Sequence, residues 1–161
     1  MEEFNEIVKE MITNETVLEM KKYRQHCDID CFAHCYYVAY TSYKVAKKLN
    51  LDYVSITRAA MVHDLFLYDW HAPKGDRKGF HAFTHGKCAC NNAVKLFELS
   101  EKEKDMIIKH MWPVTLMPPK SIEGFLLTVI DKYCTLKETM RYLSKKYNLK
   151  QKKEKTILNG K

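Results

Sequence analysis

Residues 56–65 read ITRAAMVHDL, and this stretch determines how the rest of the chain is interpreted. Ile56, Ala59, Ala60 and His63 recur at intervals of three and four residues, which places them on one face of an α-helix. That face begins with apolar side chains and ends with an imidazole, and Asp64 stands beside it. A buried carboxylate is tolerated when it is paired or bound to a metal. The pair therefore predicts a polar site inside the protein.

Other segments with helical spacing also direct polar side chains inward. Such residues are His34 in segment 29–49, His110 in segment 101–112 and Asp131 in segment 120–143, and His85 lies at the start of a further helix. A single inward histidine is usually a core residue with satisfied hydrogen bonds. Four histidines with two aspartates match the preference of transition metals for neutral imidazole and anionic oxygen. A metal site and a set of ordinary core residues both remain open at this point.

The spacing of apolar residues is helical through most of the chain, and strand-like alternation is scarce. The chain has only five glycines and four prolines among 161 residues. We expect an all-α protein that forms one compact multi-helix bundle. The expected helices lie near 2–12, 15–25, 29–49, 53–66, 83–98, 101–112, 120–143 and 144–150. Segment 67–82 is expected to be a long loop, and segment 112–120 a second irregular connection.

Charge is distributed unevenly along the sequence. Residues 145–161 contain seven lysines and one glutamate, whereas residues 1–144 are almost neutral, with 20 basic and 19 acidic residues. We expect one helical domain over 1–144 and a basic, solvated tail over 145–161. A nearly neutral body argues against a broad nucleic-acid surface, so nucleic acid is expected to bind only through the tail, if at all.

Neither a membrane segment nor a signal peptide is expected. No apolar run approaches the ~20 residues that span a bilayer. The N-terminal segment MEEFNEIVKE lacks the basic and apolar regions of a signal peptide. We therefore expect a cytoplasmic protein. In that compartment the six cysteines are expected to be reduced and mostly buried, and Cys27, Cys31 and Cys35 to stack on one face of a helix.

The order of His34, then His63-Asp64, then Asp131 resembles the H…HD…D signature of the HD-domain superfamily. The first histidine begins HCYYVAYTSYKVAKKL, the pair ends ITRAAMVHDL, and the last aspartate lies in LLTVIDKYCTL. The resemblance covers roughly residues 22–142. His85 and His110 are similar to the two additional histidines of HD proteins that bind two metal ions.

This resemblance implies a set of metal ligands. His34, His63, Asp64 and Asp131 would hold a first ion, and Asp64 would bridge to a second ion held by His85 and His110. The ions would be two divalent transition metals, with iron or manganese ahead of zinc, cobalt or nickel. The implied activity is hydrolysis of a phosphoester or phosphoanhydride in a nucleotide or small phosphorylated metabolite. Asp64 and His63 would be the catalytic residues, and a metal-activated hydroxide would be the nucleophile.

The chain departs from many HD proteins just after the pair. The run HDLFLYDWH has no lysine or histidine shortly after the aspartate, where many relatives carry a residue that contacts phosphate. The substrate class is therefore left open. Arg77, Lys87 and His81 are the candidates for binding substrate, although residues of this kind are more often solvated loop residues.

Two other functions stay open on the sequence. Some two-iron HD proteins are oxygenases, and the ligands alone do not separate them from hydrolases because redox chemistry depends on the ion and its surroundings. Alternatively, the basic tail could bind RNA or an acidic partner while the metal cluster serves only the structure.

Overall fold

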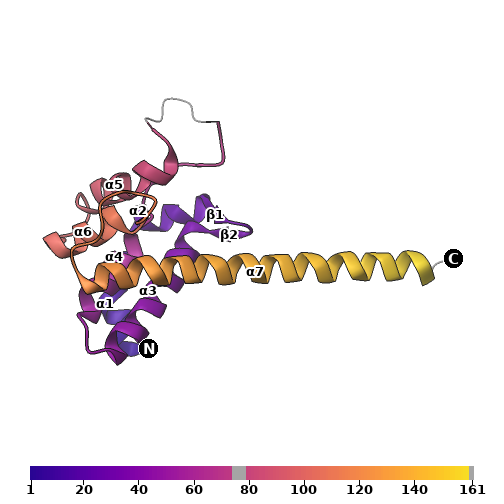
Figure 1. The fold of residues 1–161 in the computed structure, drawn as a ribbon, viewed down its shortest axis with the longest axis horizontal. Coiled ribbons are helices and arrows are strands. Elements are labelled where there is room, and N and C mark those ends of the chain that lie inside the picture. Colours follow the sequence, from indigo (N-terminus) through magenta and orange to yellow (C-terminus); the bar gives the residue numbers. More distant parts are fainter. Residues whose placement is uncertain (74–78, 160–161) are drawn as a thin grey trace.

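The computed structural model describes residues 1–73 and 79–159, and for residues 150–159 only the backbone is described. The described residues form seven α-helices, one 3₁₀ turn and a two-stranded antiparallel hairpin (Figure 1). The predicted all-α class and helical bundle are therefore confirmed. The elements are α1 (Glu2–Thr13), α2 (Glu15–Leu18), η1 (Glu19–Lys22), β1 (Arg24–His26), β2 (Ile29–Asp30), α3 (Cys31–Lys48), α4 (Tyr53–Val62), α5 (His81–Ala93), α6 (Glu101–Lys109) and α7 (Ile122–Asn159).

Helix α4 occupies the centre of the bundle. It packs against α3, and also against α1, α5, α6 and α7. All of its residues from Ala59 to Val62 are fully buried, which explains why this segment is apolar or small on every side. Because α4 ends in the core, His63 and Asp64 emerge where the other helices converge.

The hairpin replaces part of an expected helix. Helix was expected over 15–25, but α2 ends at Leu18, η1 ends at Lys22, and Arg24 then pairs with Asp30 in the antiparallel ladder. Cys27 lies in the turn with a φ of 53°, a left-handed conformation that cannot continue an α-helix. The prediction that Cys27 stacks with Cys31 and Cys35 is therefore wrong. All six cysteines are free thiols, as expected.

Helices α4 and α6 end earlier than predicted, and for the same reason. The Nδ1 atom of His63 donates to the carbonyl of Ala60 at 2.8 Å, and that of His110 donates to Ile107 at 2.7 Å. Each imidazole thereby satisfies a carbonyl of the last turn, which would otherwise lack a partner. The histidines that were expected within helices are in fact the residues that terminate them.

Other helix boundaries show which local signals were informative. Ser100 and Glu103 form the capping box that starts α6. Asn50 adopts a φ of 54° directly after α3. At the end of α3 the buried side chain is that of Ala46, whereas Leu49 is 56% exposed. Helix α5 ends at Ala93 rather than near residue 98.

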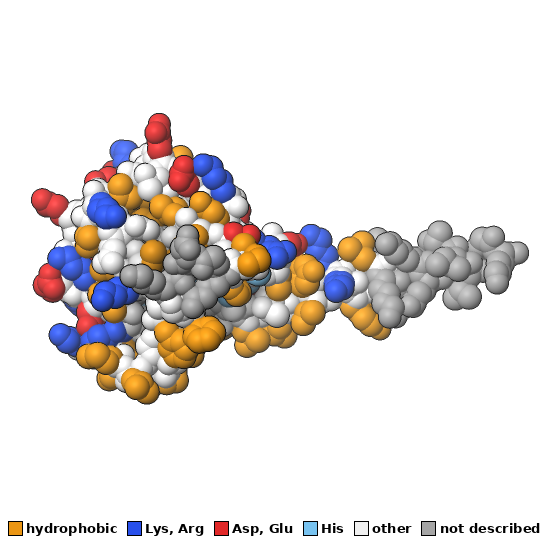
Figure 2. Space-filling view, turned by 90° about the horizontal axis from the view of Figure 1, so that it is seen from above, with side chains coloured by type: hydrophobic (Ala, Val, Ile, Leu, Met, Phe, Trp, Pro, Cys, Tyr) orange, Lys and Arg blue, Asp and Glu red, His pale blue; other side chains and the backbone are white. Residues whose placement is uncertain are grey.

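Helix α7 is one continuous helix where two shorter ones were expected. It crosses the bundle along α3, and its C-terminal part projects beyond the body (Figures 1 and 2). The backbone of the basic segment after residue 144 is thus a continuation of this helix up to Asn159. No helix in the described part of the chain is both long enough and apolar enough to cross a membrane.

Candidate metal centre

Five helices bring the six predicted ligands together. His34 comes from α3, His63 and Asp64 follow the end of α4, His85 comes from α5, His110 follows α6, and Asp131 comes from α7. Each of the six residues is at most 8% exposed. Residues separated by up to 97 positions in the sequence therefore share one buried site.

One half of the site is built around Asp131. The Nε2 atom of His34 lies 3.1 Å from Asp131 Oδ1, and Nε2 of His63 lies 3.5 Å from the same oxygen. His63 Nε2 also lies 3.3 Å from Asp64 Oδ2. Imidazole nitrogens and carboxylate oxygens thus converge on a common point.

The other half is built around the second oxygen of Asp64. The Nε2 atoms of His85 and His110 lie 3.3 Å and 3.6 Å from Asp64 Oδ1. They lie 2.8 Å from each other. Asp64 therefore presents Oδ2 to one group of ligands and Oδ1 to the other, as a bridging carboxylate would.

Three overlapping groups of these side chains bring their ligand atoms within 4.8 Å of one another, so the cluster could hold one or two metal ions. The groups are His34, His63 and Asp64; His63, His110 and Asp131; and Asp64, His85 and His110. A fourth group combines Asp64 with the buried thiols of Cys31 and Cys35.

The hydrogen bonds fix which imidazole nitrogen faces the site. A carbonyl can only accept, so the Nδ1 atoms of His63, His85 and His110 must carry the proton that each gives to a main-chain carbonyl. The lone pair of a neutral ring is then on Nε2, which points into the cluster. Among the described residues, His63 Nε2 and Asp64 Oδ1 find no hydrogen-bond partner. Buried polar atoms of this kind are normally paired, and a cation would satisfy them.

The electrostatics suit a cation as well. Burial raises the pKa of Asp64, but His63 and His85 lower it by more, so the carboxyl is ionised at neutral pH. Asp131 follows the same pattern, because His34 and His63 outweigh its burial and lower its pKa. Burial, together with His85 and His63, lowers the pKa of His110 to about 3, so this imidazole is neutral. Burial lowers the pKa of His63 and His85, but the charges around them, Asp64 foremost, raise it by more. Anionic oxygen beside imidazole nitrogen is a ligand set for divalent transition metals, and a bound cation would take the place of the protons on these rings.

Two buried residues that support the cluster were not predicted from the sequence. Gln25, on β1, donates from Nε2 to Asp64 Oδ2 at 2.5 Å. Glu138 accepts from His34 Nδ1 at 2.8 Å and lies on α7, two turns after Asp131. Burial opposes a charge on His34, but its bonds to Asp131 and Glu138 raise its pKa to about 10. Glu138 could have been identified, since a spacing of seven residues returns it to the face of Asp131.

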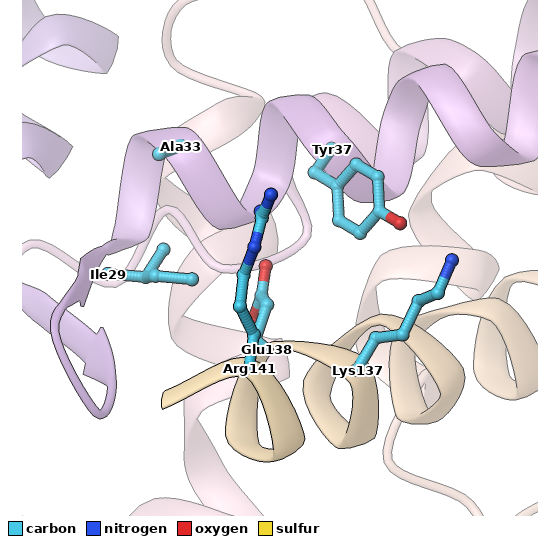
Figure 3. A pocket seen from close by; sticks show the side chains of 6 residues that line it. All are labelled: Ile29, Ala33, Tyr37, Lys137, Glu138 and Arg141. Carbon is cyan, nitrogen blue, oxygen red and sulfur yellow. The ribbon is translucent and has the colours of Figure 1, made fainter. Parts of the chain in front are cut away.

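Glu138 also lines a cavity of about 620 Å³ between α3 and α7, shown in Figure 3. Its other lining residues are Ile29, Ala33, Tyr37, Lys137 and Arg141. The cavity adjoins the Nδ1 side of His34, whereas the atom facing the cluster is Nε2. It therefore lies behind His34 rather than in front of the possible metal site.

The three substrate-binding candidates have different positions. His81 is half-buried one turn before His85, and the two rings stack with centroids 4.4 Å apart. Lys87 is exposed on α5, roughly 200° around the helix from His85, so it faces away from the cluster. Arg77 lies outside the described residues.

No protein-family model, curated protein or solved structure matches this chain. The resemblance to the HD superfamily therefore rests on the order of the motif residues in this sequence. The structure adds a helical protein in which those residues form a buried cluster that could hold metals.

Proposed function

We propose that this chain is a binuclear, HD-type metal-dependent phosphohydrolase. The observation that carries the proposal is the placement of Asp64 between two groups of ligands. Its Oδ2 atom lies 3.3 Å from His63 Nε2, and its Oδ1 atom lies 3.3 Å from His85 Nε2. One carboxylate with an oxygen toward each group is the arrangement that a pair of cations requires.

The proposed ligands divide between two positions. His34, His63, Asp64 and Asp131 would hold the first ion, and Asp64, His85 and His110 the second. Two bound cations would lower the pKa of a water and stabilise negative charge on phosphoryl oxygens, which is the chemistry that a phosphohydrolase needs. Iron or manganese suits this imidazole-rich set, and zinc, cobalt or nickel could also bind.

The protein side chains orient the ligands and keep the site dry. Main-chain carbonyls hold the rings of His63, His85 and His110, while Glu138 holds His34. Gln25 fixes the Asp64 carboxylate. The side chain of Asp131 is 11% exposed, more than those of His34, His63 and Asp64, so the approach to the site is on its side. A small phosphorylated substrate would enter there. Of the candidate substrate-binding residues that the structure describes, His81 is the one that stacks on the ring of His85.

The proposal is tested by elemental analysis of the purified protein, followed by assays of phosphate release from nucleotides and small phosphoesters with the metal it carries. We expect two transition-metal ions per chain and metal-dependent phosphate release. Asp64→Ala should lose both ions and all turnover, whereas His71→Ala, which lies outside the cluster, should keep them. Full metal content and turnover in Asp64→Ala would show that the site is assigned wrongly. Iron with substrate-dependent oxygen uptake and no phosphate release would instead identify an oxygenase.

A further inference from the structure

Helix α7 carries a second apolar face that its own domain leaves exposed. Its apolar side chains follow alternating intervals of four and three residues, the spacing of the a and d positions of a coiled-coil heptad. The exposed members, here called the α7 stripe, are Ile122, Val129, Tyr133, Leu136, Met140 and Leu143, each between 47% and 68% exposed. Half-buried Leu126 fills the remaining position, and Tyr147 continues the spacing.

The stripe is distinct from the face that builds the core. Leu127, Asp131, Cys134 and Glu138 point into the domain and are all buried. The stripe lies on the opposite side of the helix and extends along the part that projects from the body (Figure 2). An exposed apolar surface of this length is uncommon on a protein that acts alone and marks an interaction site.

From residue 126 onward the exposed charges around the stripe are of one sign, whereas Glu123, beside Ile122, is buried and paired with Lys102. Between residues 126 and 149 the acidic residues are Asp131 and Glu138, and both are buried on the core side. Lys132, Lys137 and Lys146 are exposed and occupy e and g positions that flank the stripe. The ammonium group of Lys132 also donates to the main-chain carbonyls of His110 and Thr128, so Lys137 and Lys146 are the two that a partner would meet first. In a coiled coil these positions choose the partner by charge.

We propose that the α7 stripe is the docking surface for an acidic amphipathic helix of a partner protein. A partner helix with Leu or Ile at a and d and Glu at e and g would bury the stripe and place carboxylates against the lysines. A second copy packed in parallel would instead place Lys132 opposite Lys137 of the other copy. A membrane surface is matched by a broad apolar face, whereas this stripe is a narrow seam of a and d positions. The proposal is independent of the activity at the metal centre.

The test uses the full-length chain and a labelled synthetic peptide of several heptads, with Leu at a and d and Glu at e and g. Fluorescence anisotropy should show saturable binding that weakens as salt is added. A peptide with Lys at e and g should bind at least tenfold more weakly. Lys137→Glu combined with Lys146→Glu should reverse this preference.

The chain offers a matched pair of variants. Leu143 belongs to the stripe and Leu149 does not, although they are 57% and 55% exposed. Leu143→Glu should weaken binding of the acidic peptide at least tenfold, and Leu149→Glu should leave it nearly unchanged, with circular dichroism confirming that both variants fold. Absence of binding to the acidic peptide, or equal binding of both peptides, would overturn the proposal. A dimer of the chain that Leu143→Glu abolishes would also overturn it. Binding to phosphatidylserine vesicles that Leu143→Glu abolishes, without binding of the peptide, would overturn it as well.

Discussion

His85 and His110 point their Nε2 atoms at each other across 2.8 Å, while the Nδ1 atom of each ring donates to a main-chain carbonyl. If both imidazoles were neutral, the lone pairs of their Nε2 atoms would face and repel each other. Either a proton or a cation resolves the conflict. Burial lowers the pKa of His110 to about 3. It also opposes a charge on His85, but Asp64 outweighs burial there and raises the pKa, so a proton would sit on His85 and be donated to His110. A cation beside Asp64 Oδ1 satisfies both rings and the carboxylate together.

Replacement of His110 should therefore empty one position and spare the other. We expect His110→Ala to carry one metal ion per chain where the unmodified protein carries two, because His34, His63, Asp64 and Asp131 remain. Elemental analysis after gel filtration measures this directly. His71→Ala is the control and should retain both ions. A metal content that is the same in all three proteins would contradict the two-position arrangement.

The sequence predicted this cluster because its residues lie on apolar helical faces. His63 ends the stripe of Ile56, Ala59 and Ala60, so its inward direction followed from spacing alone. What spacing could not give was the exact end of each helix. His63 and His110 terminate their helices through ring-to-carbonyl hydrogen bonds, which depend on side-chain orientation rather than on residue type.

The two supporting residues, Gln25 and Glu138, were missed for different reasons. Gln25 lies in a short hairpin whose turn depends on the left-handed Cys27, a conformation that the residue type does not indicate. Glu138 does have the correct spacing from Asp131, but it lies between Lys137 and Thr139 in a segment that resembles a solvated face. Its burial is visible only when α3 is packed against α7.

Glu138 should act as a positioning residue for His34. Its carboxylate accepts from Nδ1 at 2.8 Å, which keeps a proton on that nitrogen and turns Nε2, the atom that would bind a metal, toward the site. We expect Glu138→Ala to weaken metal binding about 10–100-fold, the range found when a partner of a metal-bound histidine is removed. Competition against a chelator measures the affinity. Glu138→Gln keeps an acceptor oxygen and should lose much less.

The neighbouring cavity residue provides the control for this experiment. Lys137 lines the same cavity as Glu138. Lys137→Ala should leave metal affinity unchanged if the hydrogen bond to His34 is responsible. Equal losses in Lys137→Ala and Glu138→Ala would mean that disruption of the cavity, not the hydrogen bond, causes the effect.

Gly86 should be required for the approach of α5 to α6. A Cβ atom at this position would lie 2.9 Å from the carbonyl oxygens of both Ile107 and Ile108. These are backbone atoms, so the two helices would have to separate, and His85 would move away from His110. We expect Gly86→Ala to destabilise the protein by about 1–3 kcal/mol. It should also lower the metal affinity of the position formed by Asp64, His85 and His110 more than that of the other position.

Urea unfolding and metal titration of Gly86→Ala test the two effects separately. Asn91→Ala is a suitable control because Asn91 is exposed on the same helix. Unchanged stability and unchanged affinity at both positions in Gly86→Ala would show that the contact between α5 and α6 is not a constraint on the site.

Glu3 should make stability depend on pH far from the metal centre. Its carboxylate accepts hydrogen bonds from Lys47, Tyr43 and Tyr53, which lower its pKa from 4.5 to about 2. Because the folded pKa is the lower one, the unfolded chain binds the proton more readily, and the stabilisation by Glu3 is fully present only above pH 4.5. It is lost as the pH falls from there toward 2.

Glu3→Gln should therefore be less stable than the unmodified protein at pH 6, and the difference in stability should shrink through this window. Urea unfolding as a function of pH measures it, and Glu6→Gln, at an exposed pair with Lys9, should show no comparable trend. The difference in unfolding free energy between Glu3→Gln and the unmodified protein could instead stay constant down to pH 2. That result would mean that the ionised form of Glu3 is not what holds α1 to α3.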